Sequence, residues 1–254
     1  MTVGKPVRGS LTIVGTGVRL VGQVTLEALA SIERAQKLLY LVADPLTEVW
    51  IRQRNPTAES LAGYYAKGKR RRVTYGEIVQ RILSFLRQGI DVTAAFYGHP
   101  AMFADPTHAA MKIARQEGYE ARVLPAISAE DCLFADLLVD PGGRGCQSYE
   151  ATDFLNRTPR FDPRCPLILW QVSVIGEDSV ADSANREGLQ ELVKVLERHY
   201  SSRHEVVVYL ASWYPVCRPV IRRLPLKKLP TAAVPIMATL YVPPRRRIRR
   251  RRRA

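Results

Sequence analysis

The first half of the chain alternates short apolar runs with stretches in which apolar positions recur every three or four residues. The runs, such as residues 11–14, fit buried strands, and the stretches, such as residues 23–36, fit amphipathic helices. This alternation is typical of βαβ units around a parallel sheet, so the sequence predicts an α/β protein. Further strands are predicted at 38–42, 91–96, 120–124, 167–172, 206–210 and 236–242, and a further helix at 187–200.

Three more helices are predicted from the polar residues that precede them. Thr74, with Glu77 three residues later, matches a capping box, which would make Tyr75 the first residue of a helix. Asp105 precedes a proline, and Ser128 precedes a stretch with two acidic residues, so both fit N-caps. The helix after Thr74 carries its apolar residues on one face and is therefore expected to be amphipathic.

The length of 254 residues suits two α/β halves. We expect an N-terminal domain at 1–124, a C-terminal domain at 125–244 and an arginine-rich tail at 245–254. The net charge of +14 depends on that tail, because its eight arginines leave 14 − 8 = +6 for the rest of the chain. Like charges repel one another, so the tail is expected to be disordered. A contact of the tail with nucleic acid or with an acidic peptide stays open.

Composition argues against several classes of protein. Hydrophobic residues make up 46% of the chain, which suffices for a sizeable core, but no apolar run reaches the roughly 18 residues of a membrane span. The N-terminus lacks the pattern of a signal peptide. The four cysteines are far apart and form no CxxC pair, so we expect neither a metal site nor a disulfide framework. A reduced, cytoplasmic protein without a membrane partner is the resulting expectation.

Two glycine-containing loops directly follow predicted strands. Gly15 and Gly17 flank a threonine after the strand at 11–14, and a lone GxG of this kind fits either a tight turn or a ligand loop. Residues 97–100 (Tyr-Gly-His-Pro) follow the strand at 91–96 and so lie at its carboxyl end. Ligands of α/β folds bind at the carboxyl ends of strands. The sequence therefore favours a nucleotide-like ligand at these loops.

Several motifs follow one another in a fixed order along the chain. They are residues 11–17, 22–26, 32–35, 97–100 and 128–132, together with 96–103, 126–137 and 149–155. In this order they resemble the tetrapyrrole-methylase superfamily, and the last three are similar to the borosin-type peptide α-N-methyltransferases. The resemblance implies two α/β domains, S-adenosylmethionine in the cleft between them, and S-adenosylhomocysteine as a product.

The resemblance also implies which residues bind the cofactor, at the positions that match the family's motifs. Corrin and porphyrin methylases have a loop rich in Asp, Pro, Glu and Leu that is replaced here by residues 18–24, which disfavours a tetrapyrrole substrate. The implied cofactor-binding residues are Gly15, Gly17, Tyr97, His99, Met102, Phe103, Ser128, Ala129, Gln171, Ala211, Ala238 and Thr239.

Residues 64–75 combine three tyrosines with a cluster of lysines and arginines. Taken alone, this segment fits either a solvated basic loop with packing aromatics or a reactive site. The resemblance assigns Tyr65, Arg71 and Tyr75 to the catalytic positions of borosin methyltransferases, which makes this segment the substrate loop of the N-terminal domain. Arginines also flank Arg71 on both sides, so the register of the catalytic arginine stays open among the three.

The chemistry of amide methylation calls for such side chains. A backbone amide N–H is a very weak acid, so the enzyme must remove its proton or stabilise the imidate, whose charge lies on the carbonyl oxygen. A phenolate, with an ordinary pKa of about 10, is a suitable base when a positive charge lies beside it. We predict that Tyr75 is the base or oxyanion stabiliser and that Arg71 and the helix N-terminus lower its pKa. Tyr65 would hydrogen-bond the substrate amide.

The resemblance further implies a peptide substrate and a homodimer. Fused borosin enzymes carry their substrate at their own C-terminus, whereas this sequence ends in arginines, so we expect a separate ribosomal precursor peptide. No nucleic-acid partner is expected despite the tail, because aromatic and basic residues do not interleave as in a stacking platform.

Three other functions stay open. A methyltransferase of the same fold could act on a tetrapyrrole or another small molecule, which the absence of a neighbouring precursor gene would favour. An RNA methyltransferase would incorporate methyl groups into RNA. A protein that binds the cofactor or the precursor without catalysis would show binding but no turnover.

Overall fold

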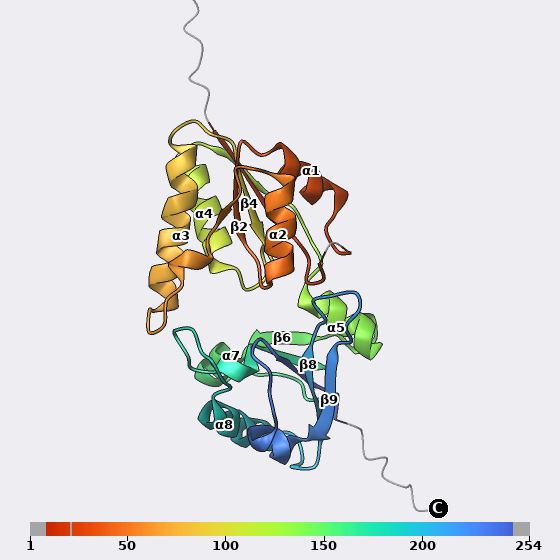
Figure 1. The fold of residues 1–254 in the computed structure, drawn as a ribbon. Helices are drawn as coiled ribbons and strands as arrows, with labels where there is room; N and C mark the ends of the chain where they lie inside the picture. Colours follow the sequence, from red (N-terminus) through yellow and green to blue (C-terminus); the bar gives the residue numbers. More distant parts are fainter. Residues whose placement is uncertain (1–8, 21, 246–254) are drawn as a thin grey trace, which may run out of the picture. The chain divides into compact units, whose positions relative to one another are not determined.

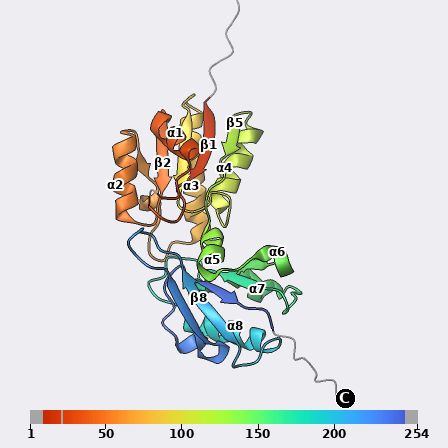
Figure 2. The same ribbon diagram turned by 90° about the vertical axis from the view of Figure 1, so that its right-hand side faces the viewer.

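The structure, a computed structural model, describes residues 9–20 and 22–245. They form two compact units, which Figures 1 and 2 show from two sides. Among the described residues, the first unit comprises 9–20, 22–132, 178–180 and 211–218, and the second comprises 133–177, 181–210 and 219–245. The division lies after Cys132, whereas the sequence predicts one at 124/125, and two short segments of the second half of the chain belong to the first unit.

The first unit is built on a parallel sheet with the strand order β3-β2-β4-β1-β5 among the described residues. Phe96, the last residue of β4, is level with Gly15 of β1 and with Leu41 of β2. The carboxyl ends of these three strands therefore share one edge of the sheet. The strands are β1 (Ser10–Gly15), β2 (Lys37–Leu41), β3 (Glu59–Ser60), β4 (Val92–Phe96) and β5 (Glu120–Val123).

Helices cover both faces of this sheet because its strands are apolar on both sides. Leu11 and Ile13 of β1 are buried in the core that contains α3 and α4. Val14 of the same strand belongs to the opposite core, with α1 and α2. Each fully buried Leu or Ile side chain contributes about 1.5–3 kcal/mol. The helices are α1 (Leu26–Arg34), α2 (Pro45–Arg54), α3 (Arg71–Leu86) and α4 (Asp105–Gln116), with the short 3₁₀ helix η1 (Ala62–Tyr64) before α3.

The second unit contains a mixed sheet with the order β6-β7-β10-β8-β9, in which only the pair β6–β7 is parallel among the described strands. One face packs on α7, α8 and η3 through a single apolar core. The elements are α6 (Pro141–Arg144), β6 (Gln147–Glu150), α7 (Ala151–Arg157), β7 (Leu167–Trp170), η2 (Val172–Val174), α8 (Arg186–Glu197), β8 (Glu205–Leu210), β9 (Val220–Pro225), η3 (Leu226–Thr231) and β10 (Thr239–Val242). Helix α5 (Ala129–Leu137) contains the division between the units.

The predicted α/β class is confirmed, and so is each predicted strand, although bounds move by a few residues. Three helices and three strands are not predicted from the sequence: α2, α6, α7, β3, β6 and β9. No described helix combines the length and the apolar character that crossing a bilayer requires. The predicted disordered tail is residues 245–254. Its first residue, Arg245, donates its N–H to the Pro163 carbonyl at 2.7 Å, and residues 246–254 lie outside the described residues.

Candidate active site

The carboxyl ends of β1 and β4 form a topological switch point. The two strands are neighbours, but the chain crosses the sheet in one direction from β1 to β2 and in the other from β4 to β5. A crevice at such a point is the usual ligand site of open α/β sheets. The two loops touch there, since the Gly98 N–H donates to the Gly17 carbonyl at 2.7 Å. The fold thus joins the two glycine-containing loops that the sequence analysis singles out.

The three glycines of these loops serve different purposes. A Cβ on Gly15 would lie 2.3 Å from the carbonyl oxygen of Gly98, so Gly15 is needed for the loops to pack against each other. Gly17 has a φ of +69°, which favours glycine, and a Cβ there would collide with Gln23. Gly98 shares the positive φ, at +68°, but a Cβ there would meet no atom of the described chain within 4 Å. Gly98 is therefore the position at which the backbone leaves room for a ligand.

The loop after β4 carries four of the implied cofactor-binding residues. His99 closes a turn, because its Nδ1 accepts the N–H of Ala101 at 3.1 Å and its carbonyl accepts the N–H of Met102 at 3.2 Å. Phe103 has a φ of +51°, which is uncommon for a bulky residue, and its side chain is 46% exposed. Tyr97 is 42% exposed. Exposed aromatic side chains on a backbone held in this way fit a binding loop.

Ser128 is the N-cap of α5, as the sequence predicts. Its Oγ accepts the N–H groups of Glu130 and Asp131 at 3.2 Å each and donates to the Asp131 carboxylate at 2.6 Å. The Ser128 N–H also donates to that carboxylate, at 2.7 Å, and the Ser128 carbonyl accepts the N–H of Cys132. All polar groups of Ser128 are thus engaged, so its hydroxyl serves the helix cap and not a cofactor.

Replacement of Ser128 by alanine is therefore expected to lower the free energy of unfolding by about 1 kcal/mol, the usual value of such a cap. The affinity for S-adenosylmethionine should change less than about twofold, or roughly 0.4 kcal/mol. Chemical denaturation and calorimetric titration measure the two quantities. Ser31→Ala is the control, since the Ser31 hydroxyl only bonds the Glu27 carbonyl on an exposed helix. A large loss of affinity at unchanged stability would instead make Ser128 a direct ligand.

The second unit brings together another group of implied cofactor-binding residues. Gln171, directly after β7, has a φ of +55°, and the Ala238 carbonyl accepts the N–H of the following residue at 3.2 Å. Met237 has a φ of +67°, and Thr239 begins β10 and is buried. Ala211 is also buried but belongs to the first unit, directly after β8. Two residues other than glycine in the left-handed region within one junction mark it as a candidate binding site.

The three implied catalytic residues and Tyr97 form a cluster in the first unit. Arg71 and Tyr75 lie four residues apart on α3 and so share one face of the helix. Tyr65, directly after η1, donates a hydrogen bond to the hydroxyl of Tyr75. The positive charge of Arg71 acts on all three phenols. The fold thus joins a segment before α3, one turn of α3 and the loop after β4.

Burial controls the acidity of these phenols. It raises the pKa of Tyr65 and Tyr75 above the ordinary value, and Arg71 lowers each by a smaller amount. The Asp105 carboxylate raises the pKa of Tyr75 further, whereas the hydrogen bond from Tyr65 lowers it. The prediction of a lowered pKa for Tyr75 is therefore wrong, although Arg71 acts in the predicted direction.

The predicted capping box at Thr74 is also wrong. Helix α3 begins at Arg71, and Thr74 is a buried residue within it whose hydroxyl donates to the Tyr64 carbonyl at 3.3 Å. Glu77 forms an ion pair with a lysine instead of capping the helix. Tyr75 is the fifth helical residue, beyond the first turn, so the partial charge of the helix end does not account for its acidity.

Exposure and charge indicate which of Arg70, Arg71 and Arg72 acts on the tyrosines. Arg70 is the N-cap of α3 and lies 3.9 Å from the Asp178 carboxylate, with its side chain 80% exposed. Arg72 is exposed as well. Arg71 is half-buried, and its charge is the one that acts on the tyrosines. The geometry therefore favours Arg71 among the three.

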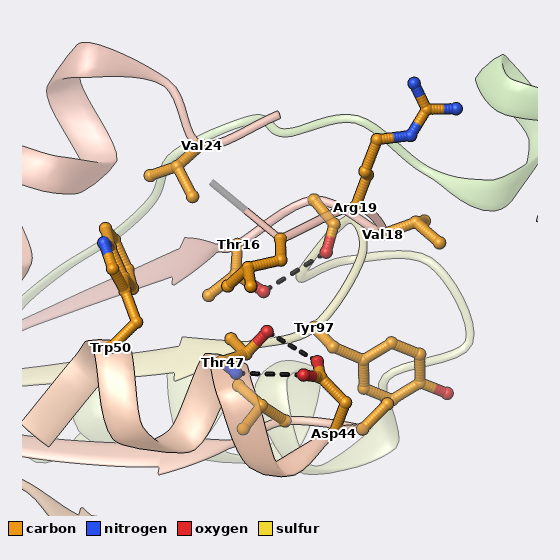
Figure 3. A pocket seen from close by; sticks show the side chains of 12 residues that line it. Thr16, Val18, Arg19, Val24, Asp44, Thr47, Trp50 and Tyr97 are labelled. Atoms are coloured by element: carbon orange, nitrogen blue, oxygen red, sulfur yellow. Dashed lines mark hydrogen bonds between the residues drawn. The ribbon is translucent and has the colours of Figure 1, made fainter. Parts of the chain in front are cut away.

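The sequence analysis misses a small pocket that also includes Tyr97 (Figure 3). The pocket lies between the loop after β1 and the start of α2, and Val24 and Trp50 contribute apolar walls. The Asp44 carboxylate accepts the N–H of Thr47 at 2.9 Å and so caps α2. It also accepts a hydrogen bond from the Tyr214 hydroxyl at 3.1 Å. An aspartate followed by proline is a usual helix start, which could have revealed α2 from the sequence.

Within the described residues, no group of three or more His, Cys, Asp and Glu side chains could hold a metal ion.

Several curated proteins are similar to this chain over 93–94% of its length. The "methyltransferase/ribosomally synthesized cyclic peptide dendrothelin A precursor" of Dendrothele bispora and the corresponding omphalotin A precursor of Omphalotus olearius are each 43% identical to it. A type III borosin precursor of Anomoporia bombycina is 39% identical. The chain spans only 58%, 58% and 28% of these three relatives, whose names include a peptide precursor besides the methyltransferase.

Solved structures share the fold at low sequence identity. Uroporphyrin-III-C-methyltransferase of Thermus thermophilus superposes with a TM-score of 0.68 at 18% identity, covering 93% of this chain and 92% of that one. Cobalt precorrin-4 methyltransferase gives 0.66 at 19% identity, covering 96% and 98%. Residues 10–214 match the family model for Tetrapyrrole (Corrin/Porphyrin) Methylases, and the chain belongs to that family of methyltransferases.

Proposed function

We propose that this protein transfers methyl groups from S-adenosylmethionine to backbone amide nitrogens of a peptide, which acts as a separate molecule. The cluster of three phenols around Arg71 carries the proposal, because it offers a base and a fixed positive charge to a group as inert as an amide. The names of the relatives, which join a methyltransferase to a cyclic peptide precursor, support a peptide as the substrate.

The residues present fit such a methyl donor. Open space at Gly98 and the exposed rings of Tyr97 and Phe103 suit a flat, partly apolar ligand. When bound, the donor supplies an activated methyl group that leaves a neutral thioether behind, so the protein needs to activate only the amide.

Tyr75 is the base in the proposed mechanism. Tyr65 donates a hydrogen bond to its oxygen, and Arg71 balances its negative charge once the proton is lost. The phenolate oxygen of Tyr75 then takes the amide proton while the nitrogen lone pair forms the new N–C bond. Because Tyr65 has the more strongly raised pKa and is the donor in this pair, it keeps its proton and supports Tyr75. This refines the predicted role of Tyr65 as a direct partner of the substrate.

Mass spectrometry of an added peptide tests the proposal. The protein is mixed with S-adenosylmethionine and a synthetic peptide that carries the precursor part of the Dendrothele bispora relative. Fragment ions should place each added CH₂ on a backbone nitrogen. Methylation of side chains only would overturn the assignment of the amide. A parallel reaction in which a porphyrinogen is methylated and the peptide is not would favour the small-molecule alternative.

A further inference from the structure

The edge strand β9 of the second unit is open on one side. It pairs with β8 in antiparallel register from Val220↔Leu210 to Pro225↔Glu205. In the part of the chain that the structure describes, no strand pairs with its other side, and Figure 1 shows it at the margin of its unit. At six residues it is longer than the other three edge strands, β3, β5 and β6, which have two to four. A row of backbone donors and acceptors is thus available for another strand.

The surroundings of this edge are strongly basic. The sequence contains no aspartate or glutamate after Glu205, although this part of the chain includes β9, η3 and β10. Arg222 and Arg223 on β9 and Lys227 and Lys228 in η3 are all exposed. Glu205 lies 3.3 Å from Arg223, and this pair is itself more than half exposed. The charge along the edge therefore remains positive and suits an acidic partner.

An extended peptide fits both features, whereas a nucleic acid fits only one. Basic side chains attract phosphates and carboxylates alike. The open edge, however, presents alternating N–H and C=O groups, which match the backbone of an added strand. A phosphodiester backbone has no donors with which to continue such a ladder. The partly exposed Ile221, at 39%, adds an apolar contact on the same strand.

We propose that β9 binds an acidic, extended segment of the peptide substrate by strand addition, outside the residues that are methylated. This inference rests on the proposed function and names a second contact for the same substrate. It has a chemical consequence: a methylated backbone nitrogen has no hydrogen to donate, so a segment methylated on consecutive residues does not pair with β9. The edge thus pairs with the unmethylated segment and not with the methylated part of the peptide.

Hydrogen exchange tests the proposal with defined probes. The first probe is a synthetic peptide that alternates glutamate and valine, and the second replaces each glutamate by lysine. A third carries an N-methyl group on every residue of the first. The acidic peptide should slow amide exchange in residues 220–224, and the other two should not. Equal binding of the N-methylated peptide, or slower exchange elsewhere only, would overturn strand addition.

Charge reversal provides the matched comparison. We expect the double variant Arg222→Glu and Arg223→Glu to weaken binding of the acidic peptide about tenfold. The control is the double variant Arg186→Glu and Arg198→Glu, which makes the same charge change on exposed residues of the α8 region and should change the affinity less than about twofold. If the basic residues only protect the edge from pairing, no peptide will bind. Competition by a single-stranded RNA as effective as that of unlabelled peptide would favour a nucleic acid. Binding is measured without turnover, so its failure leaves methylation of a short peptide intact and distinguishes this proposal from the proposed function.

Discussion

Substitution of Tyr75 by phenylalanine is expected to abolish methyl transfer while S-adenosylmethionine still binds. The change removes one oxygen atom and leaves the ring in place on α3, so the packing around it is preserved. Loss of a positioned general base lowers turnover by about 10²- to 10⁴-fold. Single-turnover assays with an added peptide measure the rate, and calorimetric titration measures the affinity for the cofactor. A rate within a few-fold of the native one would refute the assignment.

Two comparisons separate a base from a merely structural phenol. Tyr64→Phe changes a neighbouring half-buried tyrosine outside the cluster and should retain nearly full activity. Burial raises the pKa of Tyr75, so its protonated form dominates at neutral pH and turnover should increase with pH, with no plateau below about pH 10. Because the charge of Arg71 stabilises the phenolate, Arg71→Leu should move the profile to higher pH. A rate independent of pH would contradict a titrating base.

Much of the first unit could be predicted because its core strands are short, apolar and bounded by turns. The run that becomes β1 alternates between two cores, which is the pattern of a strand covered on both faces. The loops at Gly17 and Gly98 come directly after such strands in the chain, so their position at one edge of the sheet could be predicted as well. Edge strand β9 could not, since two arginines interrupt it, Pro219 precedes it and Pro225 is its last residue.

The start of α3 shows why the details of the site escape sequence analysis. Thr74 and Glu77 match a local capping signal that predicts a start at Tyr75, but the helix begins four residues earlier, at Arg71. There the N–H of Arg71 donates to the Asp178 carbonyl at 2.7 Å, a contact between residues more than a hundred positions apart. No local pattern encodes that partner. The raised pKa of Tyr75 is of the same kind, because burial depends on the tertiary packing and outweighs the local charge.

Gly15→Ala is expected to disrupt the loops at the switch point and, with them, binding of the cofactor. The added Cβ would lie 2.3 Å from the Gly98 oxygen, 2.5 Å from the Ala126 Cβ and 2.7 Å from the Pro100 Cδ. Two of these neighbours belong to a loop that a hydrogen bond fixes at Gly17, so none of the three can yield freely. Overpacking of this kind costs about 1–3 kcal/mol or more.

The comparison with Gly63→Ala makes the reason testable. A Cβ at Gly63 would meet no described atom within 4 Å. The free energy of unfolding of that variant should therefore lie within about 0.5 kcal/mol of the native value, and the variant should bind S-adenosylmethionine as tightly as the native protein does. For Gly15→Ala, thermal unfolding and calorimetric titration should show a loss of stability and of cofactor affinity together, because one displacement causes both. Lost affinity at native stability would mean that Gly15 touches the cofactor itself. Native values of both would mean that the loops can separate at little cost, and the packing argument would fail.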